Sequence, residues 1–334
     1  YLKNFGIIKD DGNDNFVTAS ENNQTNDENL AALGVGAMTR GLTNLEMTAA
    51  YAALANKGEY KEPLTFSKIE DSTGEVLFDS DNVITHQVTS EETAYQMTSA
   101  LQSTGQYYGN IYLNGTDFAI KTGTTDDYVD FWCVGYTPYY TVGIWMGADD
   151  QNIRMNGNSV ERAALMWNTI NNQILDGYEI AEFERPDSIV EMEVDTMSGK
   201  LPTELSYMDT RGTVKTEIFG PKNKPTEEDD VHTLVTIDTR NNLLASDVTP
   251  SWAMAQVSYL KSKSNYDPKE FNNILPRDWA FRAPTKYSDL IYVEPLPEED
   301  EEDEDEDDKE DKDEGGDNPP NPCLLYTSPS PRDS

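Results

Sequence analysis

Cysteine, histidine and basic residues are scarce in this sequence, and each scarcity excludes a class of site. Its 334 residues include two cysteines, Cys133 and Cys323, and two histidines, His86 and His232. Two cysteines are too few for a disulfide framework, and so few thiols and imidazoles nearly exclude a Cys/His metal cluster. We therefore expect no metal ion and no cofactor, and we expect both histidines to be surface or capping residues.

The charge balance is strongly acidic. The 25 lysines and arginines are opposed by 62 aspartates and glutamates, which gives a formal net charge of -37. Such a chain repels phosphate backbones and anionic headgroups, so nucleic acid is not expected as a partner. Residues 298–314 hold 15 of the acidic residues and two lysines. The remainder of the chain is therefore acidic as well.

Long apolar runs are absent. The longest uncharged stretch covers the 18 residues 131–148, and Gly135, Pro138 and Gly143 divide it into short strand-like runs. We expect no transmembrane helix here. Because the sequence begins with Tyr1 rather than methionine, it indicates a truncated piece, and a membrane anchor is expected only in a missing N-terminal segment.

Composition divides the chain into four segments. Residues 295–322 contain proline, glycine and acidic residues with almost no apolar side chains, a composition that cannot bury enough surface to fold. Residues 323–333 match a translated sequencing adapter, which indicates a cloning or assembly artefact. The expected segments are the main domain, an accessory module, a disordered acidic tail and this artefact, at residues 1–177, 178–296, 297–322 and 323–334.

Local signals predict helices packed on an antiparallel sheet, which is an α+β fold. Two capping boxes open helices, at Thr43 with Glu46 and at Thr89 with Glu92. Apolar periodicity predicts a third helix, and β-type runs predict strands. This helix covers residues 159–174, and the strands cover residues 64–70, 75–78, 118–125, 131–136 and 140–146.

Beyond residue 177 the sequence predicts a small β-rich module. Prolines separate short strand-like runs at residues 189–194 and 233–238. Pro250 is a favourable helix start, so residues 252–260 are predicted to form a helix.

Several apolar residues of the main domain are expected in its core. Trp132, Trp145 and Trp167 are predicted to be core aromatics rather than ligand platforms. Cys133 lies on an apolar strand and is predicted to be a buried, inert thiol.

The most informative motif is Lys121-Thr-Gly-Thr-Thr125, on a predicted strand. Glycine weakens a strand and lysine resists burial, so the motif indicates that a ligand approaches this backbone, although an exposed strand with a solvated lysine is the alternative. In a regular pleat Lys121 and Gly123 share one face. Thr122 and Thr124 share the other, so twist or a bulge would be needed to direct all four at one ligand. K-T-G is one signature of serine penicillin-recognising enzymes.

Segments on both sides of the motif carry a family resemblance. In chain order they are Gly41-Leu-Thr-Asn-Leu-Glu-Met-Thr-Ala-Ala-Tyr-Ala-Ala-Leu-Ala-Asn-Lys-Gly58, Thr93-Ala-Tyr-Gln-Met-Thr98, Ala119-Ile-Lys-Thr-Gly-Thr-Thr125, Phe131-Trp-Cys-Val-Gly-Tyr-Thr-Pro138 and Gly143-Ile-Trp-Met-Gly147. Together they resemble the later part of the transpeptidase domain of class A penicillin-binding proteins, over about residues 1–176. Residues 189–232 resemble the extension that follows this domain in many Gram-positive members.

The resemblance implies acyl transfer. In this family a serine attacks the D-Ala-D-Ala carbonyl of a peptidoglycan stem peptide, expels D-alanine and passes the acyl group to an amine. β-Lactam antibiotics acylate the same serine.

The resemblance also assigns roles within the motif. It implies that Lys121 is catalytic and supplies positive charge near the substrate carboxylate. Thr124 would be catalytic through its backbone N–H, one of two oxyanion donors. Thr122 and Thr124 would bind the substrate through their hydroxyls. Gly123 would let the substrate lie against the strand edge, and Thr125 completes the binding segment.

The family's nucleophile motif does not precede Lys121. Ser258-Tyr-Leu-Lys261 spells S-x-x-K but follows Lys121 by 137 residues, in the wrong order. We expect the nucleophile to be encoded before Tyr1 and this fragment alone to be inactive.

The family also suggests where the complete protein works and what else it carries. It would act on the extracytoplasmic face of a bacterial, Gram-positive membrane and would include a glycosyltransferase domain. One alternative is a D,D-carboxypeptidase or penicillin-sensing relative. The other is a non-catalytic cell-wall-binding protein with the same fold.

Overall fold

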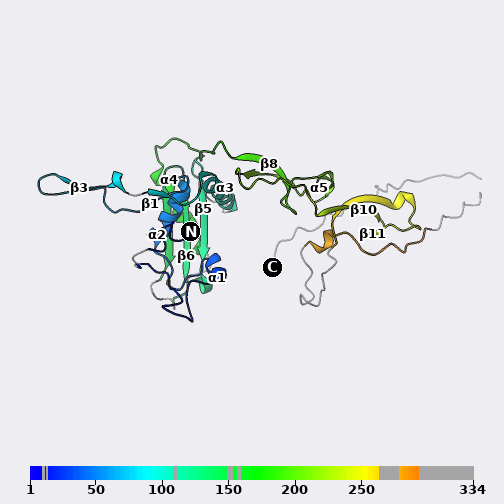
Figure 1. Cartoon of the computed structure of the whole chain (residues 1–334), viewed down its shortest axis with the longest axis horizontal. Coiled ribbons are helices and arrows are strands. Elements are labelled where there is room, and N and C mark those ends of the chain that lie inside the picture. The colour runs from blue at the N-terminus through cyan, green and yellow to red at the C-terminus, as the bar shows by residue number, and fades with distance from the viewer. Residues whose placement is uncertain are drawn as a thin grey trace, which may run out of the picture.

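The structure is a computed structural model that describes residues 1–292 except residues 10, 11, 13, 84, 108–110, 149, 151, 152, 156–158 and 263–277. Figure 1 shows a helix-flanked sheet in the N-terminal half and a series of small β elements in the C-terminal part. The predicted acidic tail at residues 297–322 and the adapter-like residues 323–334 lie outside the described residues. The combination of helices and antiparallel sheets confirms the predicted α+β class.

A three-stranded antiparallel sheet forms the centre of the N-terminal half. Its strands are β5 (Ala119–Thr124), β6 (Asp130–Tyr136) and β7 (Thr141–Gly147), in the order β5-β6-β7. All three strands were predicted from β-type runs. The turn between β6 and β7 is closed by the Thr137 hydroxyl, which accepts hydrogen bonds from the second and third backbone N–H groups after it, at 3.2 and 3.1 Å.

Helix α4 (Ser159–Ile174) covers one face of this sheet. Trp167 on α4 is fully buried against Ile120, Cys133 and Ile144, one residue from each strand. Its indole N–H donates to a β7 carbonyl at 3.1 Å, which satisfies its one polar atom. The apolar periodicity that predicts the helix therefore marks the face that it buries, and the predicted core position of Trp167 is confirmed.

Helices α2 (Asn44–Ala55) and α3 (Glu91–Tyr107) pack on the opposite face. The first residue of α2 donates through its side-chain amide to the carbonyl of Gly143 at 2.9 Å. A Cβ at Gly143 would lie 2.0 Å from a threonine hydroxyl of α2, so glycine is needed for this close approach. Leu101 of α3 packs against Tyr136 at the end of β6.

The two predicted capping boxes have different outcomes. Thr43 caps α2 as predicted: its hydroxyl accepts from the Glu46 N–H, and the Glu46 carboxylate accepts from the Thr43 N–H. At α3 the capping hydroxyl belongs to Ser90, which accepts from the backbone N–H three residues later at 3.3 Å. The prediction of Thr89 was wrong by one residue, because Thr89 belongs to the preceding turn, where its carbonyl accepts from the Gln87 side chain at 2.6 Å.

Two small ribbons lie beside this half. Strands β2 (Lys68–Glu70) and β3 (Val76–Asp79) form the predicted hairpin, which projects away from the sheet at the left of Figure 1. Strand β1 (Glu59–Lys61) pairs with β4 (Thr85–Gln87) and closes the segment that contains the hairpin. The remaining short elements of this half are α1 (Leu30–Gly34), η1 (Ser80–Asn82) and η2 (Asp126–Tyr128).

Small antiparallel sheets make up the C-terminal part. Strand β8 (Val190–Asp195) pairs with β9 (Val214–Phe219), and helix α5 (Glu204–Met208) lies between them in the chain. A second sheet has the order β11-β10-β12. Its strands and the adjoining 3-10 helices η3 and η5 are β10 (His232–Asp238), β11 (Leu243–Leu244), β12 (Met254–Leu260), η3 (Ser251–Ala253) and η5 (Trp279–Phe281).

The predicted helix at residues 252–260 is wrong. After Pro250 the chain makes the short η3 and then continues as β12. Every residue of β12 pairs with β10 without a register shift. Side chains such as Val257 and Tyr259 favour a strand, and the pairing supplies the hydrogen bonds that a helix would form internally.

The thiol of Cys133 gives a test of the central packing. Its side chain is fully buried, and this burial raises the pKa of the thiol to about 12. Only the thiolate reacts with alkylating agents, so we expect iodoacetamide to leave Cys133 unmodified in the folded protein and to modify it in denaturant. Peptide mapping by mass spectrometry would measure this. Rapid modification of Cys133 in the folded protein would contradict the packing of α4 on the sheet.

Candidate functional site

The K-T-G motif lies on β5, at the edge of the central sheet. Strand β5 pairs with β6 on one side, and no described strand pairs with its other side. Helix α3 packs beside the start of β5, where a Cβ at Gly105 would lie 2.6 Å from the ring of Phe118. Further along the strand Lys121 and Thr124 are exposed and Gly123 is half-buried. Such an edge can accept an extended peptide as a further strand.

The strand is regular, so its side chains alternate between two faces. Its pairing with β6 runs without a register shift, and the bulge that would turn all four residues towards one ligand is not found in β5. Thr122 lies on the α4 face, opposite Cys133, and is 7 % exposed. Lys121 lies on the other face, and its ammonium donates to the Thr122 carbonyl. The structure thus brings the motif residues to one strand edge but not to one face.

The turn after the motif contains Asp126, Asp127 and Asp130, which the sequence predicts to form a solvated turn, with a calcium site as the alternative. The Thr125 N–H donates to the Asp130 carbonyl at 3.1 Å, and the Asp130 N–H donates to the Thr125 hydroxyl at 2.9 Å. That hydroxyl donates to the Asp130 carboxylate at 3.2 Å, and the same carboxylate accepts from the Trp145 indole at 3.0 Å. A threonine and an aspartate that flank a predicted turn are the signal that could have identified this pair.

The predicted core position of Trp145 is wrong. The residue is 39 % exposed, because its indole lies near Asp130 instead of packing under α4. Trp132 is half-buried and lies directly opposite both Gly123 and Trp145 in the sheet. Directly opposite residues share a face, so two tryptophans lie on the sheet face that carries Lys121.

The S-x-x-K sequence at residues 258–261 belongs to the other part of the molecule. Ser258 lies on β12, and its hydroxyl donates to the Leu205 carbonyl at 2.7 Å. Lys261 donates to the Asp230 carbonyl at 2.7 Å. Both side chains hold the C-terminal sheet to its neighbouring segments, as expected for a chance match to the motif.

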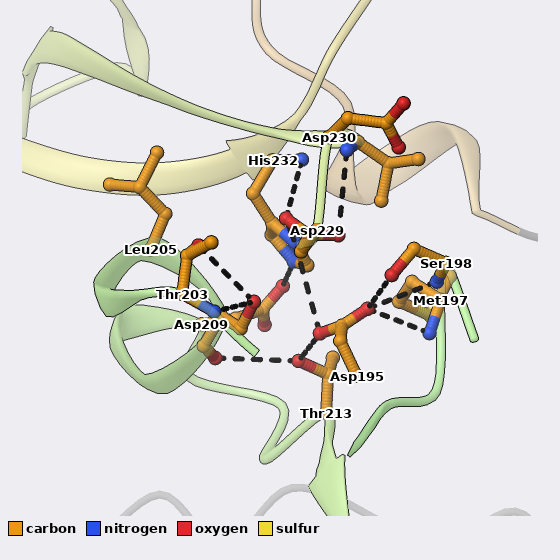
Figure 2. A network of polar contacts seen from close by, with 12 residues as sticks. Asp195, Met197, Ser198, Thr203, Leu205, Asp209, Thr213, Asp229, Asp230 and His232 are labelled. Carbon is orange, nitrogen blue, oxygen red and sulfur yellow. Dashed lines mark hydrogen bonds and ion pairs between the residues drawn. The ribbon is translucent and has the colours of Figure 1, made fainter. Parts of the chain in front are cut away.

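A second polar cluster lies in the C-terminal part, where Figure 2 shows the ring of His232 among aspartates from separate segments. The ring Nδ1 lies 2.9 Å from the Asp229 carboxylate, and Nε2 lies 3.0 Å from the Asp209 carboxylate. The Asp195 carboxylate lies 3.8 Å from Nδ1. Each of these side chains is at most 4 % exposed, so the prediction that His232 is a surface or capping residue is wrong.

The ring of His232 bridges two of these carboxylates. Each ring nitrogen lies within hydrogen-bonding distance of one carboxylate, Nδ1 of Asp229 and Nε2 of Asp209. Arg211 supplies a cation that offsets negative charge in the interior, and its Nε donates to Asp209 at 2.9 Å. A histidine and an arginine therefore hold three carboxylates together in this part of the chain.

The same interactions keep Asp209 and Asp229 ionised. Burial alone would raise the pKa of Asp209, but hydrogen bonds from Arg211 and His232 outweigh it and lower the pKa to about 2. Burial would also raise the pKa of Asp229, and hydrogen bonds from Ser198 and His232 lower it instead.

Acid is therefore expected to weaken the C-terminal part. The pKa of Asp209 is 3.8 without these interactions, so its ionised form stabilises the folded state above that pH. This contribution of about 2 kcal/mol is lost as the pH falls from about 4 towards 2. Urea unfolding across this pH range, followed by tryptophan fluorescence, would measure the loss. In Asp209→Asn the pH dependence should shrink, and an unchanged dependence would refute the assignment.

The cluster also has the donor types of a metal site. Asp195, Asp229 and His232 offer ligand atoms that all lie within 4.8 Å of one another, a set that divalent cations accept. These atoms already have partners, because Nδ1 bonds to Asp229 and the Thr213 hydroxyl donates to Asp195 at 2.6 Å. The contacts describe a salt-bridge network that links the ends of strands and loops.

Comparison with known families agrees with the resemblance. The family model described as "Penicillin binding protein transpeptidase domain" matches residues 1–166, and "Penicillin-binding protein 1A, C-terminal domain" matches residues 185–234. Penicillin-binding protein 1A of Clostridium botulinum is 35% identical over 248 residues, which cover 72% of this chain and 29% of that protein. Penicillin-binding protein 4 of Bacillus subtilis is 36% identical over 127 residues, which cover 36% of this chain and 19% of that protein.

A solved structure supports the same fold. The crystal structure of penicillin-binding protein 1A from Haemophilus influenzae matches with a TM-score of 0.51 at 24% identity, and the match covers 68% of this chain and 36% of that one. At this identity the similarity shows the fold alone. The chain spans 29% of the length of its Clostridium relative, so its matches concern a part of each relative.

Proposed function

The chain belongs to the penicillin-binding protein transpeptidase family over residues 1–166, and from this premise we propose that it carries one wall of the active site of a serine-type D,D-transpeptidase. The proposed substrates are the D-Ala-D-Ala ends of peptidoglycan stem peptides, and β-lactam antibiotics are the proposed inhibitors. One observation carries the proposal: β5 is an edge strand on which Lys121 and Thr124 are exposed.

The glycine of the motif supports a ligand along this edge. A Cβ at Gly123 would meet the side chain of Trp132 at 3.4 Å, which is an ordinary contact distance. The fold itself therefore does not require glycine at this position. The absent side chain leaves room for a peptide to approach the β5 backbone.

The proposed reaction is acyl transfer in two steps. The serine hydroxyl attacks the substrate carbonyl and forms an ester, while the peptide C–N bond breaks and D-alanine leaves with a proton. An amine of a neighbouring strand then attacks the ester, forms a new amide and returns a proton to the serine.

Each motif residue has a proposed part in these steps. The Thr124 N–H would donate to the carbonyl oxygen as it becomes an oxyanion, and Lys121 would stabilise nearby negative charge. The Thr124 hydroxyl would bind the substrate carboxylate. Thr122, on the buried face, would support the binding of the substrate carboxylate. Thr125 would support it from the turn that follows the strand.

Other parts of the activity are proposed for the full-length protein. No S-x-x-K sequence precedes Lys121 in this chain, and the relatives extend beyond its span. We place the attacking serine, a membrane anchor and a glycosyltransferase domain in that additional length. Among the described residues no helix is long and apolar enough to span a membrane. The proposed location is the outer face of a Gram-positive membrane, in keeping with the Clostridium and Bacillus relatives.

The division into two structural units is also a proposal. Residues 1–177 would form the transpeptidase part and residues 178–296 an accessory module. The side-chain amide of Gln96 on α3 donates to the Ile218 carbonyl on β9 at 3.1 Å, so the units touch through α3. This contact supports a role for the module in bracing the transpeptidase part.

Labelling of the full-length protein with a fluorescent penicillin tests the proposed function. We expect one covalent adduct, mapped by mass spectrometry to a serine and prevented by prior incubation with an unlabelled β-lactam. With a D-Ala-D-Ala peptide and an acceptor amine, a transpeptidase forms the amide product, whereas a carboxypeptidase forms the free acid. Folded full-length protein that forms no adduct would fit a wall-binding protein and would overturn the proposal.

A further inference from the structure

The turn that follows the K-T-G strand is tied to the whole central sheet through Asp130. This residue begins β6, and three hydrogen bonds of 2.9 to 3.2 Å join its backbone and carboxylate to Thr125, the residue that directly follows β5. The other carboxylate oxygen accepts from the indole of Trp145 on β7 at 3.0 Å. One side chain thus connects β5, β6 and β7.

The contact between Asp130 and Trp145 lies on the sheet face that carries Lys121. Asp130 is paired with Gly147, and Trp145 is paired with Trp132, which is itself opposite Gly123. Paired residues share a face and alternate residues of a strand return to it. Lys121 lies two residues before Gly123, so it shares this face with the aspartate and the indole.

Gly147 shows that the backbone makes room for this contact. A Cβ at this position would lie 2.6 Å from Cζ2 of Trp145 and 2.7 Å from Oδ1 of Asp130. Real Cβ atoms do not approach other atoms this closely, so any side chain at position 147 would push the two partners apart. The glycine at position 147 therefore allows the hydrogen bond between the Asp130 carboxylate and the Trp145 indole.

The hydrogen bonds also define what Thr125 can do. A threonine hydroxyl has one proton to donate. In Thr125 this proton is directed to the Asp130 carboxylate, so it is not available to a substrate carboxylate. The residue is therefore suited to fixing the end of β5, one position after Thr124.

We propose that Asp130 is a positioning residue of the acyl-transfer site. By holding Thr125 to Trp145 it fixes the end of β5 and, with it, the backbone N–H of Thr124. The inference rests on the proposed function, in which this N–H donates to the oxyanion. Oxyanion donors act only from a well-defined position, and a displacement of about 1 Å costs about 100-fold in rate.

Two substitutions in the full-length protein test the inference. Asp130→Asn keeps the shape of the side chain but leaves one acceptor oxygen for two donors, the Thr125 hydroxyl and the Trp145 indole, and Trp145→Phe removes the indole donor. Time courses with a fluorescent penicillin separate the dissociation constant of the initial complex from the rate constant of acylation. We expect each variant to lower that rate constant by about 10- to 100-fold and to change the dissociation constant by less than about threefold.

The double variant and a matched control distinguish positioning from general destabilisation. Because both residues act through one contact, the double variant should acylate no more than about threefold slower than the slower single variant. Asp126→Asn removes an exposed carboxylate of the same turn and should acylate at the parent rate. Melting temperatures should stay within about 2 °C of the parent.

The outcomes separate this inference from the function on which it rests. Parent protein that forms no adduct would overturn both. Parent protein that is acylated, with Asp130→Asn and Trp145→Phe acylated at the same rate, would overturn the positioning role alone. Rate losses that follow the loss of melting temperature, or that multiply in the double variant, would also reject it in favour of a merely structural role.

Discussion

Replacement of His232 by leucine is expected to destabilise the C-terminal part by about 3–5 kcal/mol. The imidazole is fully buried, with Nδ1 2.9 Å from the Asp229 carboxylate, Nε2 3.0 Å from the Asp209 carboxylate and the Asp195 carboxylate at 3.8 Å. Leucine would fill much of the space but would leave three buried carboxylates with Arg211 as the neighbouring cation. Removing one partner of a buried ionic network is costly because the remaining charges stay out of water.

Hydrogen exchange resolves this effect along the chain. In His232→Leu we expect amides of β8 and β10 to exchange about 150- to 5000-fold faster, while amides of β5–β7 keep the parent rates. His86→Leu is the matched control, since His86 is exposed, and it should change stability by less than about 1 kcal/mol. Parent-like protection of β10 in His232→Leu would show that the network does not hold this part together.

Replacement of Lys121 by alanine in the full-length protein is expected to slow penicillin acylation by about 100- to 1000-fold. Lys121 is exposed on the edge strand, and its ammonium donates a hydrogen bond to the carbonyl of the neighbouring Thr122. The side chain is thus little used in packing, and its charge is placed where the proposed substrate would lie. We therefore expect Lys121→Ala to lower the rate of acylation without lowering the stability of the fold.

A second exposed strand lysine provides the comparison. Lys61 ends β1, away from the central sheet, and Lys61→Ala removes the same charge from the protein. We expect this variant to be acylated at the parent rate and both variants to melt within about 2 °C of the parent. Equal acylation by Lys121→Ala and Lys61→Ala would remove Lys121 from the proposed mechanism.

Local chemistry predicted the elements whose stabilising contacts are close in sequence. Helix α4 was predicted at residues 159–174 and is found there, because its apolar periodicity directly records the face that it buries. The capping box of Thr43 and Glu46 was predicted for the same reason, since both partners lie within one turn. The K-T-G strand could be recognised because its flanks, as well as the motif, carry the family pattern.

Apart from the Thr89 cap, which was wrong by one residue, the failed predictions concern contacts that are far apart in sequence. His232 was interpreted as a surface residue because its partner Asp209 lies 23 residues away and nothing local marks the pair. The apolar pattern of residues 252–260 is compatible with a helix or with a strand. Pairing with β10 makes this segment a strand. Trp145 could be placed near Asp130 only once the order of β6 and β7 was known.

The structure of the full-length protein acylated by a penicillin would test the central claim most directly. The claim is that the edge of β5 forms one wall of the acyl-transfer groove. We predict that the ester carbonyl oxygen of the acylated serine lies about 3 Å from the backbone nitrogen of Thr124, with the antibiotic carboxylate near the Lys121 ammonium. An acylated serine with its adduct bound away from β5, and Lys121 directed into solvent, would contradict it.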